Sequence, residues 1–107
     1  MEGPDQLLVL DYTTGNLHRL DLKTKSFDKI NGGFGGGDGL TRDTKGRLFA
    51  SNYKTGQLFV LDKPESKPQI IPTEGLASAA DISISPDGKY LMVPDMEKGK
   101  LFFVQLP

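Results

Sequence analysis

Short apolar runs alternate with turns rich in Gly, Asn and Asp along most of the chain. The clearest example has an apolar run at Leu48–Ser51, a turn at Asn52–Gly56 and a second run at Gln57–Leu61. Runs this short, interrupted this often, indicate β-strands joined by hairpins instead of helices. We therefore expect an all-β chain with no helix longer than one turn.

The same pattern occurs on both sides of this segment. Leu7–Leu17 aligns with Leu48–Leu58 at a spacing of 41 residues, and Leu91–Leu101 aligns with it at a spacing of 43. A period in the low forties with four short strands per unit is typical of a β-propeller blade. The turn glycines that recur at the same place in the three units are Gly15, Gly56 and Gly99.

We expect a β-propeller fragment of about two and a half to three four-stranded blades, forming a single partial domain over residues 1–107. If the strands of a blade are lettered A to D from the axis outward, the strand order is BCD-ABCD-ABC. The units span about 7–31, 38–72 and 80–107. The expected strands are Leu7–Asp11, Asn16–Leu22, Ser26–Ile30, Gly39–Arg42, Arg47–Ser51, Gln57–Asp62, Gln69–Ile71, Ala80–Ser85, Lys89–Val93 and Lys100–Leu106.

Composition excludes several classes of function. Thirteen Lys and Arg against 14 Asp and Glu give a net charge of −1, so no nucleic-acid partner is expected. The absence of cysteine excludes disulfides and Cys-based zinc sites. No apolar stretch is long enough for a membrane span, and Met1–Pro4 lacks the features of a signal peptide. We expect a soluble chain without a membrane partner, and the compartment stays open.

The glycine-rich stretch Asn31–Gly37 invites comparison with a phosphate-binding loop. It lacks the Gly-Lys-Ser/Thr ending and the G-x-G-x-x-G spacing, and a strand pattern follows it instead of a helix. We expect these glycines to carry the chain from the outer strand of one unit to the inner strand of the next, where little side-chain volume is tolerated.

Asp38 and Asp81 are the candidate metal ligands. They lie 43 residues apart, each at the entrance of an expected inner strand, where propellers present side chains to the central channel. Converging carboxylates can bind a divalent cation, which could polarise a carbonyl or lower the pKa of a bound water. The alternative is that each Asp caps a turn through its side chain.

Other polar residues favour structural roles. Asp11, Asn52 and Asp95 recur before a glycine-ended turn, which predicts Asx turns. His18, the single histidine, occupies a strand position that Phe fills in the other units, so we expect it to pack. No Gly-x-Ser-x-Gly motif or cysteine is present to form a hydrolase triad. No catalytic or cofactor-binding residue is assigned from the sequence.

Two pairs of segments resemble a known family. Gly37–Leu40 followed by Asp43–Ser51 resembles a blade of the SMP-30/gluconolactonase/luciferin-regenerating-enzyme family of six-bladed propellers. Ala79–Ile82 with Leu91–Pro94 resembles the last blade of bacterial members, and similar motifs occur in NHL and other six-bladed propellers. The resemblance implies one divalent metal in the channel, bound by one Glu, two Asn and one Asp from different blades. The Asp-Gly-hydrophobic motif maps that Asp onto Asp38.

Two functions follow from this resemblance. The chain would be the C-terminal segment of a calcium-, zinc- or magnesium-dependent lactone or ester hydrolase, inactive alone because the Glu and Asn ligands belong to other blades. The alternative is a non-enzymatic, NHL-like segment that binds a protein or small ligand. The end sheets would leave apolar faces bare, so the expected partners are further copies, with a homodimer favoured, or the rest of a parent propeller.

Overall fold

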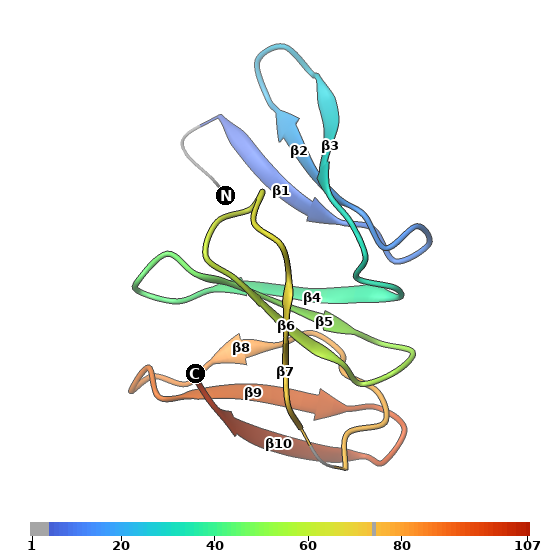
Figure 1. Ribbon diagram of the computed structural model, residues 1–107, viewed down its shortest axis with the longest axis vertical. Helices are drawn as coiled ribbons and strands as arrows, with labels where there is room; N and C mark the ends of the chain where they lie inside the picture. Colours follow the sequence, from blue (N-terminus) through green and yellow to red (C-terminus); the bar gives the residue numbers. More distant parts are fainter. Residues whose placement is uncertain (1–4, 74) are drawn as a thin grey trace.

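The computed structural model describes residues 5–73 and 75–107 and contains ten β-strands in three antiparallel sheets (Figure 1). This part of the chain has no helix, and therefore none long and apolar enough to cross a membrane. The strands are β1 (Gln6–Leu10), β2 (Leu17–Asp21), β3 (Phe27–Asn31), β4 (Gly37–Arg42), β5 (Leu48–Asn52), β6 (Leu58–Leu61), β7 (Gln69–Ile71), β8 (Ser83–Ile84), β9 (Tyr90–Asp95) and β10 (Lys100–Gln105).

Each sheet is a meander in which neighbours in sequence are neighbours in space. The orders are β1-β2-β3, β4-β5-β6-β7 and β8-β9-β10, which we call the first, middle and third sheets. In Figure 1 the first sheet lies at the top, the middle sheet at the centre and the third sheet at the bottom. The all-β prediction is confirmed, as is the grouping of the strands into three, four and three.

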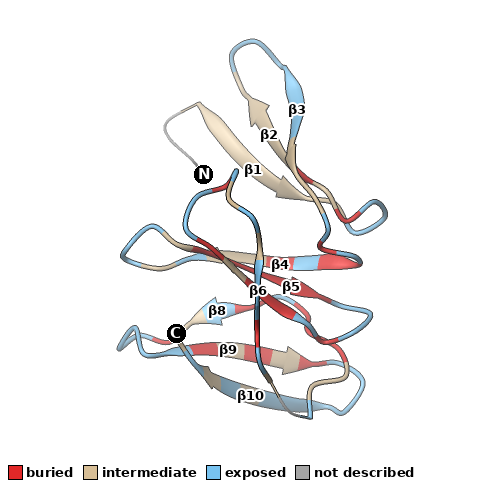
Figure 2. Cartoon of the chain, viewed as in Figure 1, coloured by how far each residue is buried: buried red, intermediate tan, exposed pale blue. Residues whose placement is uncertain are grey.

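The core lies between the sheets, in two layers. One cluster joins the first and middle sheets around Leu17, Leu48 and Phe59, and the other joins the middle and third sheets around Phe49, Leu58 and Val93. Because the middle sheet is covered on both faces, every residue of β5 is buried. Figure 2 shows the consequence, with buried residues concentrated in β5 and β6 while β3 and β10 are mostly exposed.

The eighth strand is shorter than expected, because Ser83–Ile84 alone pairs with β9 where the sequence predicted Ala80–Ser85. The carbonyl of Ala80 accepts a hydrogen bond from Ser51 Oγ (2.8 Å) in the middle sheet. In β9, Pro94 has no N–H to continue the ladder, although its carbonyl accepts from Ala80 N (3.1 Å). The segment before Ser83 therefore bonds partly to the neighbouring sheet.

The ladder register of β8 differs by one residue from that of β4. Ser83 pairs with Met92, whereas Phe49, the counterpart of Met92 in the middle sheet, pairs with Thr41. Thr41 and Ser83 are thus 42 residues apart, one fewer than Phe49 and Met92. The bulge of β4 between Gly37 and Leu40 adds one residue on the Asp38 side of Thr41, so this shift does not contradict the expected equivalence of Asp38 and Asp81.

The glycine-rich connection holds a buried anchor that the sequence analysis missed. Phe34, between glycines on both sides, is fully buried and contacts the ring of Phe59 edge-on at 5.3 Å. Its N–H donates to Gly15 O (3.1 Å) in the turn between β1 and β2. A Cβ on Gly15 would lie only 2.5 Å from Gly35 O, so the glycines allow the two backbones to approach while Phe34 fills the core. This stretch links β3, at one edge of the first sheet, to β4, at an edge of the middle sheet.

Candidate functional site

The two predicted metal ligands line one cleft. Asp38, in β4 of the middle sheet, and Asp81, just before β8 of the third sheet, border a cavity of about 420 Å³. Residues 8–10 of β1 also line it, so the first sheet, the middle sheet and the segment that enters the third sheet contribute to the cleft. Both carboxylates are exposed to solvent.

A β-bulge presents Asp38 to the cleft. Gly37 pairs with Asn52 and Leu40 pairs with Ala50, so β4 carries one residue more than β5 between these pairs. In this bulge Gly39 N donates to Ser51 Oγ (2.8 Å), and Gly39 is buried while Asp38 is exposed. Bulges redirect a side chain in this way, and they are common beside functional sites.

Ser51 positions the Asp81 segment as well. Its hydroxyl accepts from Gly39 N and donates to the carbonyl of Ala80, so one buried side chain connects the residues next to both carboxylates. Ala80 and Ile82 are buried on either side of the exposed Asp81. The sequence analysis did not single out Ser51, and its signal was a polar residue at the end of an otherwise apolar strand.

The donor atoms of the cleft suit a cation that prefers oxygen, but they form a partial set. Carboxylates are ligands for calcium and magnesium, which take six or more oxygens. Among residues 5–73 and 75–107 there is no group of three or more His, Cys, Asp or Glu side chains placed to hold a metal. Arg42 lines the same cleft and adds a positive charge that opposes cation binding.

The β1 wall of the cleft is a free strand edge. Val9 faces His18 in β2, and the flanking bonds are Asp11 N to Asn16 O (2.9 Å) and Leu22 N to Asp5 O (2.7 Å). Because bonded and non-bonded pairs alternate along an antiparallel ladder, Leu8 and Leu10 direct their N–H and C=O groups away from β2. No described strand pairs with that edge.

The predicted Asx turns are confirmed. In each, a side-chain oxygen accepts hydrogen bonds from the backbone N–H groups two and three residues later, at distances of 2.9–3.4 Å. Asp95 is buried and also accepts from Ala77 N (2.8 Å), which is the main reason that its pKa lies below the ordinary value. The residues are Asp11, Asn52 and Asp95.

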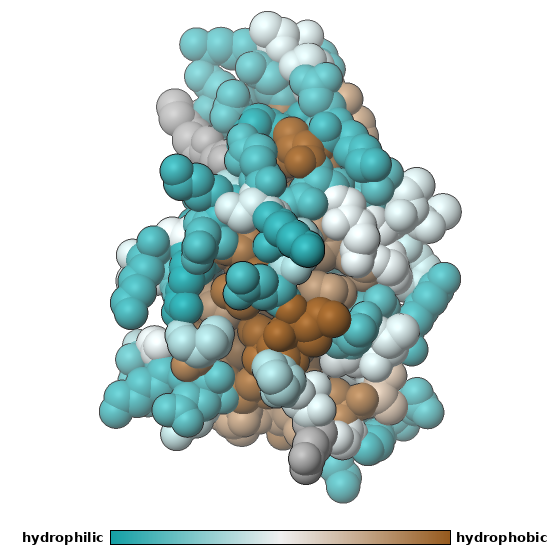
Figure 3. All heavy atoms as spheres, viewed as in Figure 1, coloured by the Kyte–Doolittle hydropathy of each residue, from teal (hydrophilic) through white to brown (hydrophobic). Residues whose placement is uncertain are grey.

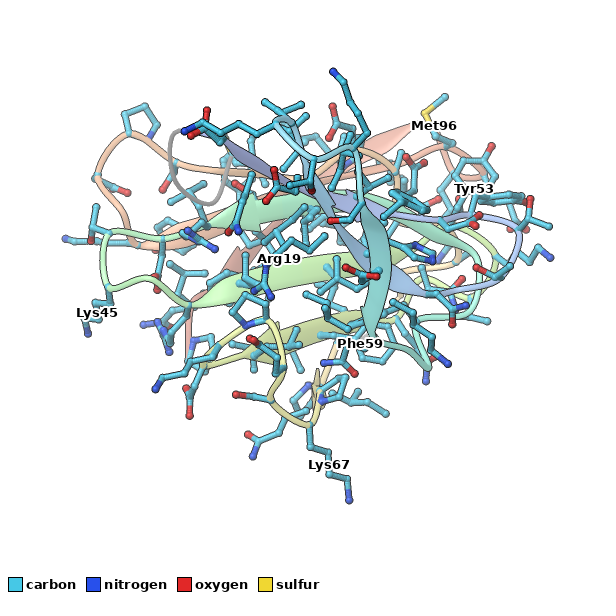
Figure 4. The ribbon with its side chains drawn as sticks, turned by 90° about the horizontal axis from the view of Figure 1, so that it is seen from above. Arg19, Lys45, Tyr53, Phe59, Lys67 and Met96 are labelled. Atoms are coloured by element: carbon cyan, nitrogen blue, oxygen red, sulfur yellow. The ribbon has the colours of Figure 1, made fainter. Side chains whose placement is uncertain are left out.

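A second hollow lies where these turns gather. Tyr12, Tyr53 and Met96 each follow one of the Asx residues, and together they line a cavity of about 410 Å³ with Lys54 and Ser78. Figure 4 shows Tyr53 and Met96 at one end of the molecule and Lys45 at the other. The two tyrosine rings meet edge-on at 6.1 Å, and Lys54 Nζ lies 5.3 Å from the ring of Tyr12. Ser78 is buried, and its Oγ has no hydrogen-bond partner among the described residues.

His18 has the packing role expected of it. Its ring stacks on Phe27 with centroids 4.3 Å apart and planes 15° from parallel. Its Nδ1 is buried and has no hydrogen-bond partner in the part of the chain that the structure describes. It does not line the cleft of Asp38 and Asp81.

A scan against protein-family models found no match for this chain, and a search of curated proteins found none either.

Proposed function

We propose that this chain forms part of a β-propeller of the SMP-30/gluconolactonase type, in which the cleft at β1 and β4 binds a divalent cation used in lactone or ester hydrolysis. The observation that carries the proposal is that Asp38, in the middle sheet, and Asp81, in the segment that enters the third sheet, line one cleft. The stack of antiparallel sheets built from one repeated unit supports the propeller architecture.

Within that function Asp38 and Asp81 are cation ligands. Ser51 is a positioning residue, since it bonds the backbone beside each carboxylate. A bound cation would polarise the substrate carbonyl and activate water. Further ligands would come from additional sheets, so hydrolysis is not expected of this chain alone and metal affinity is the informative measurement.

Calorimetric titration with calcium, magnesium and zinc tests the proposal. Because two carboxylates supply few of the oxygens that such a cation takes, we expect a weak dissociation constant, about 10⁻⁴–10⁻³ M. Asp38→Asn and Asp81→Asn should each weaken binding severalfold, while Asp62→Asn, at an exposed position outside the cleft, should not. Tight binding that survives both cleft substitutions would contradict the assignment.

The hollow at the turns favours a second candidate, non-enzymatic ligand binding as in NHL-type propellers. Exposed tyrosine rings provide stacking surface, and the unpartnered Ser78 Oγ provides a buried polar group for orientation. A small planar molecule with a hydrogen-bonding group fits this combination.

An NMR screen with small aromatic and sugar-like fragments tests this candidate. Shift changes should cluster at the turns that carry Tyr12, Tyr53 and Met96. Tyr12→Ala and Ser78→Ala should each remove them, whereas Tyr90→Ala, on the third sheet, should not. Shift changes confined to the cleft of Asp38 would argue against the second candidate.

A further inference from the structure

The two ends of the stack expose surfaces whose repeat counterparts are buried inside it. Leu17, Leu58 and Leu101 occupy the same position in the three units. Leu17 and Leu58 are fully buried, because each lies on a face covered by the next sheet, whereas Leu101 is 55% exposed. The exposure of Leu101 therefore reflects its place at the end of the stack.

We call the outward surface of the third sheet the trailing face. Phe103 stands opposite Met92, and Leu101 stands opposite Pro94, in the β9–β10 ladder. Phe103 is 60% exposed and meets Tyr90 edge-on at 6.3 Å. The counterparts of Met92 and Leu101 in the middle sheet are Phe49 and Leu58, both fully buried against the third sheet. The trailing face consists of Tyr90, Met92, Pro94, Leu101 and Phe103.

The outward surface of the first sheet is the leading face. Val9 is half-buried, while its counterparts Ala50 and Val93 are fully buried. Phe27, next to it through the stack on His18, is 52% exposed. No described strand lies against this surface. The leading face consists of Leu7, Val9, His18, Leu20 and Phe27.

Both internal sheet contacts join one face of each kind. The middle sheet presents Leu48, Ala50 and Phe59 to the first sheet, and these are the counterparts of the leading face. It presents Phe49 and Leu58 to the third sheet, and these are the counterparts of the trailing face. The chain thus already contains the contact between the two kinds of face twice, and it leaves one face of each kind exposed.

We propose that a second copy of this chain covers both faces. The trailing face of each copy packs on the leading face of the other, through the same kind of sheet-on-sheet contact that is present inside each copy. Two such contacts related by a two-fold axis give a closed dimer of six sheets. A copy of the chain carries both complementary surfaces, so one partner satisfies both ends. The inference rests on the stacking of the sheets and not on the cation site.

The exposed apolar residues of the two faces supply surface for this arrangement. Stable interfaces bury about 1,200–2,000 Å² in total, and a dimer closed through two faces per copy divides that requirement between two contacts. Three of the large hydrophobic residues that are more than half exposed lie on the two faces, namely Phe27, Leu101 and Phe103. Ile70, 59% exposed on β7, lies on neither and provides a matched control.

Sedimentation velocity on the full chain at micromolar concentration tests the proposal. We expect the wild-type chain to sediment as a dimer. Phe103→Glu and Phe27→Asp should each raise the dimer dissociation constant by about a hundredfold, because each damages both contacts of a two-fold dimer. Ile70→Glu should leave the dimer intact. Circular dichroism should show the same β signal in all variants, since these side chains are already exposed.

A mixing experiment distinguishes this arrangement from a dimer through two identical faces. An equal mixture of the Phe103→Glu and Phe27→Asp chains retains one undamaged contact between a wild-type trailing face and a wild-type leading face. Native mass spectrometry should therefore detect a heterodimer of the two variants, although neither variant alone forms a dimer at the same concentration. The proposal is overturned by a wild-type monomer, by open-ended oligomers, by a dimer lost in Ile70→Glu, or by failure of the mixture to form heterodimers.

Discussion

At the scale of single residues, the junction between the middle and third sheets depends on a missing side chain. A Cβ on Gly39 would lie 2.6 Å from Ile82 N, 2.7 Å from Ala80 O and 2.8 Å from Ser51 Oγ. Two of these atoms are backbone of the buried segment that leads into the third sheet, which cannot move without disturbing the core. Glycine at this position thus allows the bulge that exposes Asp38 and the bond that Ser51 makes to Ala80.

We therefore expect Gly39→Ala to lower the free energy of unfolding by about 1–3 kcal/mol, the usual cost of overpacking a tight site. Gly36→Ala is the matched control, because its Cβ would first meet the flexible side chain of Lys54, at 2.8 Å. Urea unfolding of both variants measures the difference. Equal stability of the two variants would show that the sheets can separate at Gly39 without penalty.

A second prediction at this scale concerns the effect of Ser51 on stability. Replacing it with Ala leaves the buried N–H of Gly39 and the carbonyl of Ala80 without their shared partner. We expect a loss of about 1–3 kcal/mol in unfolding free energy. Ser66→Ala is the control, since Ser66 Oγ accepts from an exposed N–H, that of Lys63. A Ser51→Ala chain with wild-type stability in urea would contradict this role.

At the scale of elements, three similar turns differ in what lies beyond them. Asp11 bonds the N–H groups of its own turn, whereas Asp95 also accepts from Ala77 N in the segment leading to the third sheet. Asp95 is buried, at 1% exposure. The turn between β9 and β10 is therefore tied to the chain that enters β8, and its carboxylate is part of the fold.

The hydrogen bond from Ala77 to Asp95 predicts that the stability of the fold falls in acid. Hydrogen bonding, first from Ala77, holds the pKa of Asp95 below its ordinary value of 3.8 in the folded chain. The folded state therefore gains stability from the ionised group at pH values above 3.8, and loses it as the pH falls towards the folded pKa. Asp95→Asn should be less stable than wild type at pH 7, and the difference should narrow below pH 3.8. Thermal melts across this range, with Asp62→Asn as control, measure it; a difference that widens in acid would contradict it.

Sequence patterns predicted elements better than the contacts between them. All ten strands and their grouping follow from apolar runs and turn residues, which act locally. The shortening of β8 could not be predicted, because it depends on Ser51 in another sheet. The same holds for Phe34, which looks like part of a polar loop until the first and middle sheets enclose it. The carboxylates of the cleft were identified from their repeat spacing, while the bulge that exposes Asp38 appears only in the ladder register.

At the scale of the whole molecule, burial falls from the middle of the stack to its ends. The middle sheet is covered on both faces, and each end sheet is covered on one. Figure 3 shows hydrophobic surface also at the centre of the view, around the region of β6 and β7 in Figure 1. The two end faces differ from this hydrophobic surface, because the residues at the equivalent repeat positions are buried where a neighbouring sheet covers them.

Thermal stability should therefore depend on the concentration of the chain. If folded copies associate and unfolded chains do not, mass action stabilises the folded state as concentration rises. For a domain of this size, a tenfold increase should raise the melting temperature of the wild-type chain by about 2–5 °C. In Phe103→Glu the melting temperature should be lower and nearly independent of concentration, because the trailing face no longer docks. Scanning calorimetry over a hundredfold range of concentration makes the comparison. A wild-type melting temperature that stays constant over that range would mean that each copy is stable with both end faces exposed to water.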